Sequence, residues 1–342
     1  MPETSSLRYG EAVNAALRRC LETFPETLLY GEDVGKPGGV FGVTRRLNRD
    51  FGDRVFDTPI SENAIIGSAV GAAMVGRRPI VEIMWIDFSL VGMDQIINQA
   101  ANVRYVSRGK VTAPITIRTQ QGAVPGSCAQ HSQSLEALFA HIPGLRVCIS
   151  STAQDAHDLL LSAVACDDPT LVIEARSLYN GDKQDVLLGG DIAPIGGSRL
   201  RHEGNDLTIV TWGVTTGVVR DAADLLEEEG VGADVIEAVW LNPFDDEAVA
   251  RSVAKTGRLL VVHEANVTGG FGAEIVARVV ESGASLRTPP RRIGLPDIRV
   301  PAAPHLSAAL LPSVEQIGKA AIAMLETTEG SSPVAATSGS TS

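Results

Sequence analysis

The sequence predicts an α/β protein with two domains, and three observations support that fold class. Apolar runs of strand length alternate with segments of helical apolar spacing along most of the chain, as they do in parallel sheets covered by helices on both faces. A length of 342 residues favours two domains over one. A polar, glycine-rich stretch, residues 179–205, separates two series of elements. We predict a first domain in residues 1–185, a linker in 186–205 and a smaller second domain in 206–326.

The first series opens with a helix over residues 7–22, whose apolar residues have helical spacing. A helix of small residues is expected at 62–76, where glycine and alanine allow a neighbouring backbone to approach closely. A further helix is expected at 92–107. The other elements of this series are strands at 27–30, 55–58, 79–85, 113–118, 145–149 and 170–174 and a helix at 153–165.

The second series repeats the alternation on a smaller scale. Strands are predicted at residues 207–211, 234–239, 259–263 and 291–295, with helices at 218–229, 245–255 and 272–281 between them. Residues 327–342 are rich in Ser, Thr, Gly and Ala, and we predict a disordered tail there.

Composition argues against several classes of protein. A formal net charge of -12 argues against a nucleic-acid groove or an anionic membrane surface as partner. No apolar run reaches the roughly 18 residues of a spanning helix, and the N-terminus MPETSSLRYGEAV lacks the pattern of a signal peptide. The four cysteines form no CxxC pair and have no zinc-ligand spacing, which fits a reducing compartment, so we expect a cytoplasmic protein.

Residues 57–88 contain two carboxylates in unusual positions. Glu62 falls in the first turn of the predicted small-residue helix, where a negative charge is favourable. A capping-type residue after Ser61 is the competing interpretation, and the position alone favours it. Glu82 lies inside an otherwise apolar strand, so it needs a partner or a shifted pKa if it is buried.

A histidine in a polar loop is a second candidate. His131 follows a glycine-rich stretch and precedes a helix that begins near residue 134. A loop histidine is free to face a ligand and can carry a proton near neutral pH. An ordinary surface histidine is the competing interpretation.

Several long blocks, taken in order, identify a family. They include GEDVGKPGGVFGVTRRL, RVFDTPISENAIIGSAVGAAMVGRRPIVEIMW, HSQSLEALFAHIPGLRV, PTLVIEARSLY, LTIVTWG and GGFGAEIVARV. Together they resemble the β subunits of the thiamine-diphosphate-dependent component of pyruvate, branched-chain 2-oxo acid and acetoin dehydrogenase complexes. The resemblance covers residues 7–325, and ordered blocks are far more specific than a single motif.

The resemblance implies a fold and a cofactor. The first domain is expected to resemble the pyrimidine-binding domain of transketolase-like enzymes, and the second the transketolase C-terminal domain. The glutamate of the TPISE block, Glu62 here, contacts the aminopyrimidine of thiamine diphosphate in this family. A carboxylate on that ring nitrogen favours the imino tautomer, which removes the proton of the thiazolium carbon. Phe88 matches the family aromatic near the pyrimidine, with Met84 and Ile86 on the same wall.

The resemblance also assigns a histidine and an ion site. His131 matches the family histidine that assists reductive transfer of the acyl group to a lipoyl arm. Some members bind potassium, mostly through backbone carbonyls, and the matching positions are Ile115, Ala163, Val164, Cys166 and Asp168. Cys166 replaces the usual acidic residue, a change that a backbone ligand tolerates.

Partners follow from what the sequence lacks. The chain contains no GDG segment, through which thiamine enzymes hold the diphosphate and its magnesium. The resemblance therefore implies an α subunit that brings this half-site, in a heterotetramer of two α and two β subunits. No lipoyl-bearing DKA sequence occurs either, so the acyl acceptor is expected to be a lipoyl-bearing acyltransferase or carrier protein.

Departures from the family pattern leave the substrate open. The usual SGG reads Ser107-Arg108-Gly109 here, and the loop after Arg118 lacks the usual proline. The main hypothesis is oxidative decarboxylation of a pyruvate-like 2-oxo acid. Two alternatives are a transketolase-like transfer of two carbons from a ketose to a lipoyl or carrier protein, and a noncatalytic scaffold subunit. A nucleotide-binding module based on Gly269-Gly270-Phe271-Gly272 is weak, because the motif is only a fragment.

Overall fold

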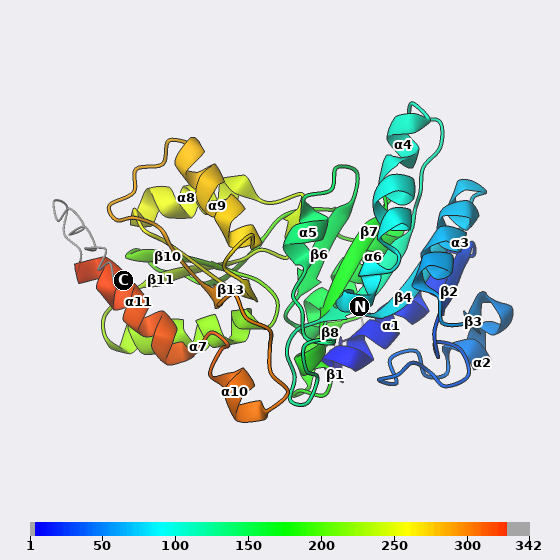
Figure 1. Cartoon of the computed structure of the whole chain (residues 1–342), viewed down its shortest axis with the longest axis horizontal. Helices are drawn as coiled ribbons and strands as arrows, with labels where there is room; N and C mark the ends of the chain where they lie inside the picture. Colours follow the sequence, from blue (N-terminus) through cyan, green and yellow to red (C-terminus); the bar gives the residue numbers. More distant parts are fainter. Residues whose placement is uncertain (1–3, 327–342) are drawn as a thin grey trace, which may run out of the picture.

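The chain folds into two α/β domains that lie side by side, as the sequence predicts (Figure 1). The computed structural model describes residues 4–326. The tail predicted at 327–342 lies outside the described residues. Each domain has one mainly parallel sheet with helices on both of its faces.

The larger sheet has seven strands in the order β12-β6-β7-β5-β4-β2-β3. Its parallel strands are β2 (Thr27–Gly31), β3 (Val55–Asp57), β4 (Arg78–Trp85), β5 (Thr116–Gln121), β6 (Arg146–Ser150) and β7 (Thr170–Ala175). The short strand β12 (Trp240–Asn242) pairs with β6 in the antiparallel sense. Because parallel strands share one direction, β2, β3, β4, β5 and β7 all end at the same side of the sheet, which we call the carboxyl edge. Ligands of open α/β sheets bind at this edge.

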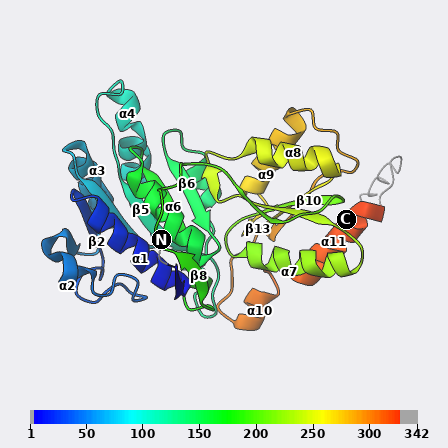
Figure 2. The same cartoon turned by 180° about the vertical axis from the view of Figure 1, so that it is seen from behind.

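Alternate residues of the strands feed two apolar cores, one on each face of this sheet. Ile80 and Val172 point toward α1 (Tyr9–Thr23) and α6 (Ala153–Ala165), which pack against each other (Figure 2). Val81 and Ile173 point toward the other face, which is covered by α3 (Glu62–Met74), η3 (Gln95–Gln99) and α5 (Glu136–Ala140).

The predicted helix 92–107 is not one regular helix. It is a π-helical turn, η3, a 3-10 turn, η4 (Ala100–Asn102), and a short α-helix, α4 (Val103–Val106). Other short turns are α2 (Leu47–Phe51), η1 (Gly52–Arg54), η2 (Ile86–Leu90), η5 (Arg176–Leu178) and α10 (Pro304–Ala308).

The smaller sheet has five strands in the order β14-β13-β10-β11-β9. They are β9 (Arg199–His202), β10 (Leu207–Thr211), β11 (Ala233–Glu237), β13 (Leu259–Asn266) and β14 (Arg291–Leu295), and β9 alone among these five is antiparallel. The helices α7 (Thr215–Glu228) and α11 (Val314–Glu326) cover one face, and α8 (Asp246–Thr256) and α9 (Phe271–Glu281) cover the other (Figure 1). The core under α8 and α9 continues into the first domain.

The predicted linker, residues 186–205, carries structure of its own. The strand β8 (Gln184–Leu187) runs into it and pairs with β1 (Thr4–Leu7), and β9 lies within it. Both strands are short, and their partners are far away in the sequence, so local periodicity does not reveal them. The domain boundaries at 185 and 206 stay our proposal.

Candidate functional site

An aromatic cluster stands at the end of β4. The ring of His131 lies 4.7 Å from that of Trp85 and 5.3 Å from that of Phe88, centroid to centroid, and meets both edge-on. Trp85 and Phe88 also contact each other, at 5.4 Å. All three side chains are half-buried. The structure thus brings together two predicted site residues, Phe88 and His131, from separate segments.

The loop that carries His131 is held by both domains. Gln133 donates from its backbone N and its Nε2 to Oδ1 of Asp87, at 3.4 and 2.8 Å. Arg299, from the second domain, donates to the side-chain oxygen of Gln133. Burial raises the pKa of Asp87. These contacts fix the position of the histidine loop over the aromatic cluster.

Glu62 stands elsewhere on the carboxyl edge, as the first residue of α3. Its half-buried side chain has no hydrogen-bond partner among residues 4–326, and Ser61 makes no capping hydrogen bond either. The pKa of Glu32, just after β2, is raised by burial and then by the nearby charges of Glu62 and Asp33. Glu62 is therefore an unpaired carboxylate beside a second one, and no capping contact accounts for it.

The glycine-rich loop after β2 closes over this edge. Asp57, the last residue of β3, accepts hydrogen bonds from the backbone N of Gly35 at 2.6 Å and of Lys36 at 3.2 Å. Phe41, further along the same loop, meets Trp85 edge-on at 5.9 Å. The loop that follows one strand thus contacts the aromatic cluster at the end of another.

Met84 and Ile86 differ in position. Met84 is half-buried at the end of β4, whereas Ile86 is fully buried and packs in the apolar core below α3. Only Met84 therefore has surface available to a ligand. The contact of either residue with a cofactor stays a prediction.

The partner that Glu82 needs is Arg118, from the neighbouring strand. Nη1 of Arg118 donates to Glu82 at 2.7 Å, while its Nε and Nη2 donate to Glu174 of β7 at 2.8 and 3.0 Å. Tyr179 also donates to Glu174. Burial raises the pKa of Glu82, and although burial alone would lower the pKa of Arg118, its two carboxylates raise it. Three adjacent strands thus share a buried ion cluster, in which one arginine pairs with two glutamates.

Two further buried carboxylates join the domains. Glu264 of β13 accepts a hydrogen bond from the backbone N of Ala123 at 2.5 Å, and burial raises its pKa to about 7. Glu136 of α5 accepts from Trp212 Nε1 at 3.0 Å and from Gln121 Nε2 at 2.8 Å. Neither residue was predicted from the sequence, although a charged residue within the apolar run of β13 is a visible signal.

A third missed residue, Arg176, follows directly after β7. Its guanidinium carbon lies 5.1 Å from the ring centre of Phe41 and 5.2 Å from that of Trp85. Its Nη1 donates to Ser127 Oγ at 2.8 Å. The available signal was an arginine at the end of an apolar parallel strand. Its aromatic neighbours come from distant segments, so the stacking is not visible in the sequence.

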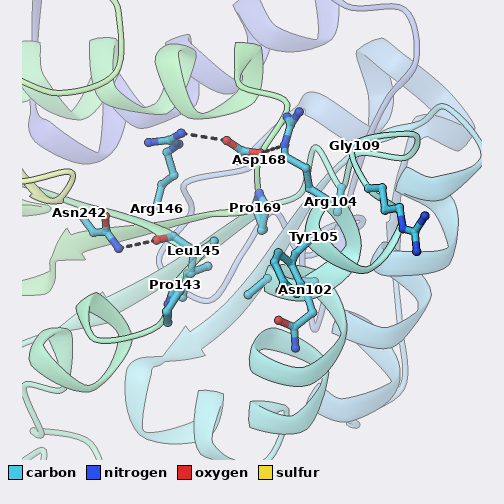
Figure 3. Close-up of a pocket in the computed structure, with 15 residues that line it drawn as sticks. Asn102, Arg104, Tyr105, Gly109, Pro143, Leu145, Arg146, Asp168, Pro169 and Asn242 are labelled. Carbon is cyan, nitrogen blue, oxygen red and sulfur yellow. Dashed lines mark hydrogen bonds and ion pairs between the residues drawn. The ribbon is translucent and has the colours of Figure 1, made fainter.

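The predicted ion residues lie at the opposite end of the strands. Asp168 precedes β7 and accepts from Arg104 Nε at 2.5 Å and from Arg146 Nη2 at 2.9 Å (Figure 3). Although burial alone would raise the pKa of Asp168, these hydrogen bonds lower it. A pocket of about 830 Å³ opens beside them, with Pro143 and Pro169 in its wall. We call this side of the sheet, where the parallel strands begin, the amino edge. It lies at the opposite end of the strands from the aromatic cluster.

Backbone carbonyls do gather near the end of α6. Those of Val164 and Cys166 accept from Arg78 Nη1 at 2.9 and 3.1 Å, that of Ala163 from Cys166 N at 3.3 Å, and that of Ile115 from Thr170 N at 2.8 Å. A carbonyl has two lone pairs, so each retains one, and the end of a helix favours a cation. The guanidinium of Arg78 already places a positive charge there. The donor types suit potassium, and its binding stays a prediction.

Among residues 4–326, no group of three or more His, Cys, Asp or Glu side chains could hold a metal ion. No helix in this range is long and apolar enough to cross a membrane.

Comparison with known proteins gives two family matches. The pyrimidine-binding domain of transketolase matches residues 5–182, and the transketolase C-terminal domain matches residues 196–317. Among solved structures, a split-gene transketolase described as an inactive beta4 tetramer aligns with a TM-score of 0.75 at 22% identity, over 93% of this chain and 98% of that one. At that identity the likeness shows the fold alone.

Curated relatives are more similar in sequence. The β subunit of acetoin:2,6-dichlorophenolindophenol oxidoreductase from Cupriavidus necator is 39% identical, over 91% of this chain and 95% of that one. The β subunit of the pyruvate dehydrogenase E1 component of Acholeplasma laidlawii is 40% identical, over 86% and 90%. The β subunit of 2-oxoisovalerate dehydrogenase from Bacillus subtilis is 38% identical, over 88% and 92%.

Proposed function

Because the chain belongs to the transketolase-like E1 β subunits of pyruvate, branched-chain and acetoin dehydrogenase complexes, we propose that it forms half of a thiamine-diphosphate site. With an α subunit, it acts as an oxidoreductase that decarboxylates a pyruvate-like 2-oxo acid. The acyl group then passes to a lipoyl-bearing acyltransferase or carrier protein. The observation that carries the proposal is the unpaired carboxylate of Glu62, on the same sheet edge as Phe88 and His131.

The residues at this edge fit the pyrimidine half of the cofactor. An aminopyrimidine offers a ring nitrogen to a carboxylate and a flat face to an aromatic side chain. Glu62 supplies the first, and the half-buried Phe88 and Trp85 supply the second. The diphosphate half has no counterpart here, because the sequence lacks GDG. We therefore assign the diphosphate and magnesium to the α subunit, in an assembly of two α and two β subunits.

The chain's own residues then have distinct tasks. Bound here, thiamine diphosphate would supply a nucleophilic carbon and an electron sink for decarboxylation. Glu62 holds the pyrimidine and its proton in position. His131, oriented by Trp85 and Phe88, can give or take a proton during acyl transfer to the lipoyl group. The aromatic cluster limits the access of water to the reacting groups.

Replacing Glu62 by Gln tests the proposal. We expect the Glu62→Gln chain, produced with its α subunit, to assemble normally but to lose about 100-fold or more in kcat with pyruvate and branched 2-oxo acids, and to bind thiamine diphosphate more weakly in calorimetry. Glu228→Gln, an exposed change on α7, is the matched control. Unchanged turnover in Glu62→Gln would refute the role of Glu62. Turnover of ketose phosphates in place of 2-oxo acids would favour two-carbon transfer.

A further inference from the structure

Arg176 packs against the aromatic cluster that contains His131, the candidate proton carrier. Its guanidinium stacks on Trp85, and the ring of Trp85 is in contact with His131. Arg176 follows the last residue of β7, so its side chain starts at the carboxyl edge, beside the end of β5. The arginine therefore lies at the edge of the sheet where the proposed function places the substrate.

The positive charge of Arg176 is not compensated within the described chain. No carboxylate of residues 4–326 lies within ion-pair distance of it, and one hydrogen bond, to the hydroxyl of Ser127, is present. Burial lowers the pKa of Arg176. The faces of Phe41 and Trp85 offset part of the cost of holding a cation there. A guanidinium carries five N–H donors, so most of them remain available to a ligand.

We infer that Arg176 recognises the carboxylate of the substrate and thereby makes this enzyme prefer anionic 2-oxo acids to neutral hydroxyketones. The inference rests on the proposed function and assigns the recognition of the substrate carboxylate to one residue of this chain. The relatives named above include both kinds, pyruvate and 2-oxoisovalerate dehydrogenases and an acetoin oxidoreductase. The planar fork of a guanidinium matches a carboxylate through two parallel hydrogen bonds, which a neutral hydroxyketone cannot accept in the same way.

Recognition of the carboxylate by Arg176 should affect mainly substrate binding. The carboxylate of a 2-oxo acid leaves as carbon dioxide, so a contact with it is not strengthened in the transition state. Such a contact lowers KM and does not raise kcat. Removing the guanidinium should therefore raise KM for a 2-oxo acid and change kcat little.

The test compares one anionic and one neutral ligand. Wild type and Arg176→Gln are each produced with the α subunit, loaded with thiamine diphosphate and magnesium, and assayed with dichlorophenolindophenol as electron acceptor. We expect KM for pyruvate to rise about 10- to 100-fold, with kcat within a few-fold of wild type. The affinity for acetoin, measured as a substrate or as a competitive inhibitor, should stay within about twofold. Arg176→Lys should raise KM less, and the exposed Arg220→Gln on α7 should match wild type.

Three results would overturn the inference. An equal loss of affinity for pyruvate and acetoin would mean that Arg176 only supports the aromatic cluster. An unchanged KM for pyruvate would mean that it does not contact the carboxylate. Loss of the α subunit on size exclusion would mean that a carboxylate of the partner pairs with it. If the wild-type pair oxidises no 2-oxo acid, the proposed function itself fails, whatever Arg176→Gln does.

Discussion

Arg118, in β5, and Arg176, directly after the neighbouring strand β7, have opposite surroundings. Arg118 lies within β5, is 1% exposed and donates to two carboxylates. Arg176 stands just beyond β7, half-buried on two aromatic rings, with a serine as its hydrogen-bond partner. A charge whose hydrogen bonds are completed inside the chain belongs to the scaffold. A charge left incomplete at the carboxyl edge has capacity for a ligand.

The glutamates follow the same division. Glu82 and Glu174 are paired inside the sheet, whereas Glu62 has no partner among the described residues and faces a second carboxylate. The interior cluster should therefore control stability, and the edge should control catalysis.

Loss of the interior cation should have the largest effect on stability. Arg118→Met leaves two buried carboxylates without their cation, and we expect the free energy of unfolding to fall by about 3–5 kcal/mol. Urea unfolding of the purified chain measures the change, with Arg220→Met as the exposed control. A loss below about 1 kcal/mol would show that the cluster does not hold the sheet together.

The buried carboxylate between the domains should make stability depend on pH. The pKa of Glu264 is raised to about 7, so its neutral form stabilises the fold below the unfolded pKa, and that contribution is lost as pH rises through 7. We expect wild type to lose about 2–3 kcal/mol between pH 5 and 8 from this group. Glu264→Gln should lose correspondingly less over the same range in urea unfolding. Parallel pH profiles for both proteins would contradict the assignment.

Replacing His131, the candidate proton carrier, should slow one half-reaction more than the other. We expect His131→Asn to slow acyl transfer to a lipoyl protein by about 100-fold and dye reduction by much less, because the proton is needed at the lipoyl sulfur. Stopped-flow measurement of both half-reactions on the assembled pair tests this. Equal slowing of the two would assign His131 to an earlier step or to packing.

A substitution at the amino edge should have the smallest effect on stability. Arg104 is partly exposed in its pair with Asp168, and Arg146 also holds that carboxylate. Arg104→Gln should therefore cost about 0.5 kcal/mol in thermal or urea unfolding. A cost of several kcal/mol would mean that this edge is as tightly coupled to the fold as the interior cluster.

The sequence predicted the fold class and the family, because ordered motif blocks carry that information. The roles of Glu62, Phe88 and His131 were predicted from the same blocks and stay proposals. The sequence also showed that Glu82 needs a partner. It did not show that Arg118 is the partner, since the pairing depends on the strand order β4-β5-β7. Short strands such as β12 pair with segments far away, and no local periodicity reveals them.

The remaining differences have similar causes. Ile86 was expected on the wall of the cofactor site; its side chain is buried in the core at the turn η2, and its contact with a cofactor stays a prediction. Arg176 becomes a candidate only when loops distant in the sequence bring Phe41 and Trp85 against it. Features that depend on one strand or loop can be predicted from the sequence, and features that depend on several need the structure.

The most direct measurement is a structure of the assembled α and β chains with thiamine diphosphate and magnesium. We expect the Glu62 carboxylate within hydrogen-bond distance of an aminopyrimidine ring nitrogen, with Phe88 packed against the ring and the diphosphate on the α subunit. A coenzyme ring bound away from Glu62, or a Glu62 side chain directed to solvent in the loaded complex, would contradict the assignment of this edge as half of the active site.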